Sequence, residues 1–151
     1  MFNRYLLGAL AFAAVSSPAF AQERPISLET DVFLVQQTEN GVDLAEATSV
    51  VPGDILQLST KYANNTGQTV TNFVIKTPVP SNVLIAGESL AELEVSVDGG
   101  TVWGPVSALT ITMEDGTERP ANAGDVTHVR WILAELAPDQ TGSVSYRATV
   151  K

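Results

Sequence analysis

The fold of this chain is decided near its C-terminal end, where residues 143–151 read SVSYRATVK. Single polar or charged residues separate four apolar ones in this stretch, namely Val144, Tyr146, Ala148 and Val150. Successive side chains of a β-strand point to opposite faces of a sheet, so a period of two predicts a strand with one buried face. Tyr146 is therefore expected in the core.

The same alternation recurs along the chain, and it predicts strands at 26–37, 55–63, 69–77, 92–97, 105–113 and 128–133, with a short one near 83–86. Segments rich in Gly, Pro, Asn and Asp separate these runs, and those residues favour turns. Only Gly87–Leu93 and Ala45–Val50 could hold a helical turn. Many short strands with frequent turns predict an all-β sandwich or barrel.

One predicted strand, 128–133, carries Trp131 in register with apolar neighbours. A Trp in the inward register of a strand usually anchors a core, so Trp131 is expected as the aromatic centre of the domain. His128 and Arg130 alternate out of phase with it. We expect both of these side chains to face solvent.

The composition bounds the class of protein. The chain has 151 residues, with 8 Lys or Arg, 17 Asp or Glu and a net charge of −9, which suits one domain and disfavours binding to nucleic acid or anionic lipid. There is no Cys. Disulfides, thiolate catalysis, iron–sulfur clusters and thiolate zinc sites are thereby excluded.

Residues 1–21 have the three parts of a secretory signal peptide: Arg4, an apolar run at 5–15, and the small-residue ending Ala19-Phe20-Ala21. The apolar run is shorter than the ~20 residues that a membrane-spanning helix needs. We expect cleavage after Ala21, which leaves a single domain at 22–151. An exported product without Cys fits a bacterial periplasmic, secreted or surface protein.

A resemblance begins at Pro52-Gly53-Asp54 and continues through Asn65 and Gly67 to the proline turn at Pro78 or Pro80. In this order, with strands between them, these residues resemble the DUF11 family of bacterial envelope modules, over about residues 26–151. The resemblance implies an immunoglobulin-like antiparallel β-sandwich of about seven to nine strands in an exported or surface protein. Many members carry tandem copies, whereas this chain carries one.

A second pattern consists of Ser96, Asp98, Gly99, Gly100 and Trp103, and it resembles the Asp-box hairpin of sialidases and other secreted β proteins. We expect a hairpin over 92–105 whose turn is built by Asp98, Gly99 and Gly100. The carboxylate should accept hydrogen bonds from turn amides, and Trp103 should fold over the inner side. A single copy of this motif indicates a structural turn.

Catalytic chemistry is sparse in the sequence. The single His128 cannot assemble a catalytic triad or a multi-histidine metal site, and the carboxylates are scattered. We therefore predict no catalytic residue and no cofactor, and a non-catalytic envelope module that acts by contact with another envelope or surface protein. The alternative is a carbohydrate-binding or calcium-binding secreted module, motivated by Trp103 and the acidic loops.

Overall fold

The computed structural model of the chain describes residues 26–151. Ten strands form in this range: β1 (Ile26–Thr38), β2 (Gly41–Glu46), β3 (Ile55–Asn64), β4 (Val70–Pro78), β5 (Val83–Ile85), β6 (Glu94–Ser96), β7 (Thr110–Thr112), β8 (Glu118–Pro120), β9 (His128–Leu136) and β10 (Thr141–Val150). The helical elements in the same range are short: α1 (Gly87–Glu92) and two 3-10 turns, η1 (Val106–Ala108) and η2 (Ala123–Asp125).

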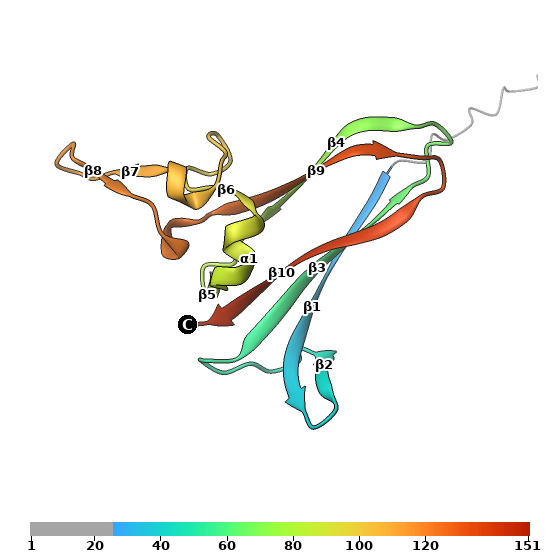
Figure 1. Ribbon diagram of the computed structural model, residues 1–151, viewed down its shortest axis with the longest axis horizontal. Coiled ribbons are helices and arrows are strands. Elements are labelled where there is room, and N and C mark those ends of the chain that lie inside the picture. Colours follow the sequence, from blue (N-terminus) through green and yellow to red (C-terminus); the bar gives the residue numbers. More distant parts are fainter. Residues whose placement is uncertain (1–25) are drawn as a thin grey trace, which may run out of the picture.

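The strands form an all-β sandwich, as the sequence predicts, with more strands than the expected number (Figure 1). A large sheet has the order β2-β1-β3-β10-β5, and a small sheet has the order β4-β9-β6. Every pairing in these sheets is antiparallel. The remaining pair, β7 and β8, forms a separate two-stranded sheet that we call the arm.

The core lies where the small sheet covers β3 and β10. Alternate residues of these strands point inward, and Leu58 and Tyr146, which are cross-strand partners, are 5% and 2% exposed. From the small sheet, Ile75 and Val129 reach the same core and are fully buried. The period of two in the sequence thus becomes burial on one face of each strand.

The β1–β2 hairpin extends beyond the covered part of the large sheet, and we call it the overhang (residues 26–46). Val32 pairs with Leu58 and Leu28 pairs with Tyr62, so both β1 side chains lie on the core-facing side of the sheet. They are nevertheless 41% and 49% exposed. The small sheet therefore ends before it reaches β1.

Of the two segments that could hold a helical turn, Gly87–Leu93 contains α1, whereas Ala45–Val50 contains none and begins with the end of β2. One strand prediction is wrong. The predicted strand at 105–113 is divided into η1 and the short strand β7. Pro105 precedes η1, and Leu109 is buried, so the apolar residues of this segment serve a turn that packs on the core.

No helix within residues 26–151 has the length and apolar character needed to cross a membrane. The predicted signal peptide, its cleavage site after Ala21 and the new N-terminus at Gln22 all lie outside the described residues.

Candidate functional site

The predicted Asp-box turn follows β6. Val95 and Gly104 exchange two backbone hydrogen bonds, with N···O distances of 2.9 and 3.1 Å, and so close the loop between them. Gly99 and Gly100 have φ angles of +79° and +95°, a region that favours glycine. The loop thus turns where the sequence predicts, although a single bridge takes the place of a returning strand.

The carboxylate of Asp98 organises this loop. Its Oδ1 accepts hydrogen bonds from the Ser96 hydroxyl (2.7 Å) and from the amides of Thr101 and Val102 (both 3.0 Å). The Val102 amide also reaches Oδ2, at 3.1 Å. These donors, the Val102 amide first and the Ser96 hydroxyl next, lower the pKa of Asp98 below its ordinary value. A carboxylate engaged in this way builds the turn.

Ser96 is the buried centre of the same loop, with no exposed surface. Its hydroxyl donates to Asp98 and accepts from the Gly100 amide at 2.9 Å. The Gly99 amide donates to the Thr127 hydroxyl at 3.1 Å. The loop is therefore fixed both internally and to the segment that precedes β9.

The expected position of Trp103 is wrong. Val95 faces the core and is bridged to Gly104, so the neighbouring position 103 faces the opposite side of the small sheet. The indole Nε1 donates to the Gly100 carbonyl at 2.8 Å. Trp103 consequently folds over the outer face of the sheet.

On that face the Trp103 ring is surrounded by basic side chains. The Arg130 guanidinium carbon lies 4.8 Å and the Lys76 amino group 5.5 Å from the ring centroid, which are cation–π distances. The ring of His128 meets Trp103 edge-on, with 6.5 Å between centroids. His128 thus faces outward as expected, but it is half-buried beside Trp103.

The ion pairs on this face are incomplete. Arg130 donates to Glu94 at 2.7 Å, whereas Lys76 has no carboxylate partner within the described chain. Two apolar residues, Val74 and Ile132, are cross-strand partners on the same side and are 37% and 53% exposed. We call this surface the Trp103 face; it comprises Val74, Lys76, Trp103, His128, Arg130 and Ile132.

The turns that carry the family resemblance are structural. Gly53 has a φ of +96°, and Asp54 accepts a hydrogen bond from the Val51 amide at 2.8 Å. The backbones of Gly53 and Asp54 also bond to Val150. The Pro52-Gly53-Asp54 turn therefore joins the start of β3 to the end of β10.

At the opposite end of the sandwich the decisive residue is Asn64, which sequence reasoning missed. Asn64 is fully buried, and its Nδ2 lies within 2.7 to 3.0 Å of the carbonyls of Gln68, Leu136 and Ala137. Its Oδ1 accepts from the Thr66 amide and hydroxyl. One side chain thus joins the β3–β4 and β9–β10 connections.

The two predicted turn residues beside it have smaller roles. Asn65 is exposed and donates to Ser27, and Gly67 supplies a φ of +75°. The strand phase that places Leu56, Leu58 and Tyr62 on the core-facing side continues to Asn64. That phase was the signal available in the sequence.

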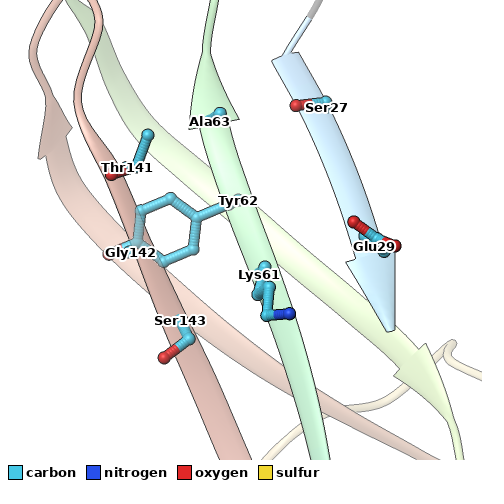
Figure 2. A pocket seen from close by; sticks show the side chains of 8 residues that line it. All are labelled: Ser27, Glu29, Lys61, Tyr62, Ala63, Thr141, Gly142 and Ser143. Atoms are coloured by element: carbon cyan, nitrogen blue, oxygen red, sulfur yellow. The ribbon is translucent and has the colours of Figure 1, made fainter. Parts of the chain in front are cut away.

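Figure 2 shows a shallow hollow near the same end of the large sheet. Tyr62 and Gly142 are cross-strand partners, and a Cβ at Gly142 would collide with the Tyr62 ring. Glu29 and Lys61 line the hollow as well, and Lys61 is paired with Asp31 at 2.7 Å. Its lining combines three hydroxyl side chains, one carboxylate, one amine, one aromatic ring and two small residues: Ser27, Glu29, Lys61, Tyr62, Ala63, Thr141, Gly142 and Ser143.

The two predicted core aromatics differ in burial. Tyr146 is 2% exposed, and its burial raises the pKa of the phenol to about 12. Trp131 lies 6.2 Å from it, centroid to centroid, but Trp131 is only half-buried at the margin of the core. Trp131 packs against the core as predicted, but at its margin rather than at its centre, where Val95, Val129 and Ala148 are fully buried.

Among residues 26–151, no group of three or more His, Cys, Asp or Glu side chains is placed to hold a metal ion.

Comparison with known proteins finds no relative of this chain. No protein-family model, no curated protein and no solved structure matches the chain.

Proposed function

We propose that this chain is a non-catalytic, exported module of the bacterial cell envelope, of the DUF11-like kind, that acts by contact with another envelope or surface protein. The observation that carries the proposal is the overhang. It exposes apolar side chains on both sides of one hairpin: Leu28 and Val32 on the core-facing side, and Val42 and Leu44 on the other. Exposed apolar side chains gathered on one hairpin are typical of a site of protein contact.

The remainder of the same sheet shows why this surface is distinctive. Toward the other end, the outer side of the large sheet carries Lys61, Ser143 and Ser145, which are ordinary solvent-exposed residues. Val42 and Leu44 are 43% and 46% exposed on that same side. Ile55 and Leu84 are also exposed on the outer side, away from the polar end. An apolar end beside a polar end of one sheet face is typical of a contact surface.

The alternatives of carbohydrate or calcium binding gain less support. An aromatic ring that stacks on sugars needs a free face, whereas cations from Arg130 and Lys76 lie against Trp103. The Asp98 oxygens that could bind calcium already accept hydrogen bonds from the turn.

The proposal that the protein is exported is supported by the sequence pattern of residues 1–21.

Site-specific photo-crosslinking in the native host tests the proposal. A photoreactive residue at Leu44 or at Val32 should give a discrete protein adduct in the envelope fraction. The matched control is Ser143, which is exposed on the polar end of the same sheet and should give none. Equal adducts at all three positions, or none at any, would contradict the proposal.

A further inference from the structure

The arm has an acidic and apolar tip. β7 and β8 pair with each other and with no other strand of the described chain, and Figure 1 shows the arm reaching away from both sheets. Met113 is 44% exposed at its end, next to Glu114 and Asp115. No basic residue occurs between positions 112 and 118.

The arm is held in a defined shape. Asp115 accepts hydrogen bonds from the Thr117 amide (2.9 Å) and hydroxyl (2.6 Å) and so builds the turn at the tip. At the base, Arg119 makes two hydrogen bonds to Asp125, of 2.7 and 2.6 Å. The carboxylate of Glu114 has no ion-pair partner in the part of the chain that the structure describes. A lone two-stranded hairpin is only marginally stable in water, so the arm gains from packing on another surface.

The Trp103 face has the complementary character. Its Lys76 is one of two cations without a carboxylate partner among residues 26–151, the other being Lys151 at the chain end, which bonds to the Ser81 carbonyl. Val74 and Ile132 provide adjacent exposed apolar surface. Trp and Arg, here Trp103 and Arg130, are the residue types that contribute most to protein interfaces. Glu94 also lies on this side of the sheet and is paired with Arg130, so Lys76 is the unpaired charge of the surface.

We infer that the arm of one copy docks on the Trp103 face of a second copy of this chain. Met113 packs against Val74 and Ile132, and the Glu114 carboxylate pairs with Lys76. The two surfaces are different, so the contact is head-to-tail, and it generates a ring or an open filament. This self-association goes beyond the proposed function, because it uses neither the overhang nor a foreign partner.

The net charge sets the conditions for this contact. Two copies repel each other because each carries a net negative charge. At ~0.15 M salt, however, screening limits the interaction between exposed charges to distances of about 8 Å. The close contact between Glu114 and Lys76 falls within that range. Association should therefore be weak at very low salt, strongest near physiological salt and dependent on protein concentration.

Sedimentation velocity over a concentration series tests the inference with the purified chain. The native chain should show a sedimentation coefficient that rises with concentration. Lys76→Glu and Glu114→Lys should each weaken association by about tenfold, because one exposed attraction becomes a repulsion of similar size. An equimolar mixture of the two variants, or the double variant alone, should restore it.

Glu39→Lys is the matched control, since Glu39 is an exposed acid in the turn of the overhang, and the same charge change there should leave the contact intact. Near-ultraviolet circular dichroism should show that every variant is folded. A single monomeric species at concentrations up to about 1 mM, which would reveal even a contact of ~1 mM Kd, overturns the inference. Association that survives both single variants also overturns it.

Discussion

At the scale of single residues, Asn64 shows how one buried polar side chain can hold a β-sandwich together. Its Nδ2 shares two hydrogens among three carbonyls, and its Oδ1 accepts from two donors, across two separate chain connections. Buried backbone groups that lose such a partner carry their full desolvation cost. Asn64 therefore has a larger effect on stability than the exposed turn residues around it.

Asn64→Ala should lower the free energy of unfolding by roughly 3–4 kcal/mol, because several buried groups would lose hydrogen bonds at once. Asn65→Ala, one position along and exposed, should cost less than about 1 kcal/mol. Urea denaturation of both variants measures the difference. Similar losses for the two would show that Asn64 does not join the two connections.

Tyr146 allows a test of pH dependence. Its hydroxyl is buried without a hydrogen-bond partner in the described chain, so Tyr146→Phe should change stability at neutral pH by no more than about 1 kcal/mol. The pKa of the phenol is about 12 in the folded protein, raised by burial, and about 10 when unfolded.

Between those values the unfolded chain releases the phenolic proton and the folded chain keeps it. Stability is therefore full below about pH 10 and decreases as the pH rises toward about 12. Tyr146→Phe should remove this part of the alkaline loss, and denaturation of both proteins across that range measures it. Parallel curves would contradict the assignment.

At the scale of elements, period-two alternation predicts most of β3, β4, β9 and β10 because these strands have residues buried on one face. β2 was not predicted; it is the edge strand of the large sheet and none of its residues is buried. Trp103 was predicted on the inner side but lies on the outer face of the small sheet. Which face its side chain takes depends on the bridge between Val95 and Gly104. Such long-range pairing leaves no local signal.

The pairing of β3 with β10 can be tested at Gly142. Gly142→Ala should destabilise the domain by about 1–3 kcal/mol, because the added methyl group meets the Tyr62 ring. Gly87→Ala is the control, since nothing lies within 4 Å of a Cβ there. In a Tyr62→Ala background the cost of Gly142→Ala should disappear, and thermal denaturation of the double-mutant cycle shows whether it does.

At the scale of the whole molecule, the two sheets of the sandwich differ in size. The parts that lie largely outside their shared core, the overhang and the arm, are the candidate contact surfaces. Five strands face three, so the core-facing side of the overhang is covered only in part: Leu34 packs against the core, whereas Leu28 and Val32 are exposed. The arm belongs to neither sheet. Both features depend on how strands are ordered across the sheets. Sequence periodicity could predict strands, but it could not predict which of them would be left uncovered.

Hydrogen exchange should distinguish the strands at the core from the parts of the molecule that lie outside it. Amides of β3, β9 and β10 border the buried core, so they should exchange only through global unfolding, whereas the arm should open locally and exchange far faster in dilute solution. If the arm docks on a second copy, its protection should increase with protein concentration while that of the overhang stays constant. Arm amides as slow as those of β3 in dilute solution would mean that the arm is packed within a single molecule.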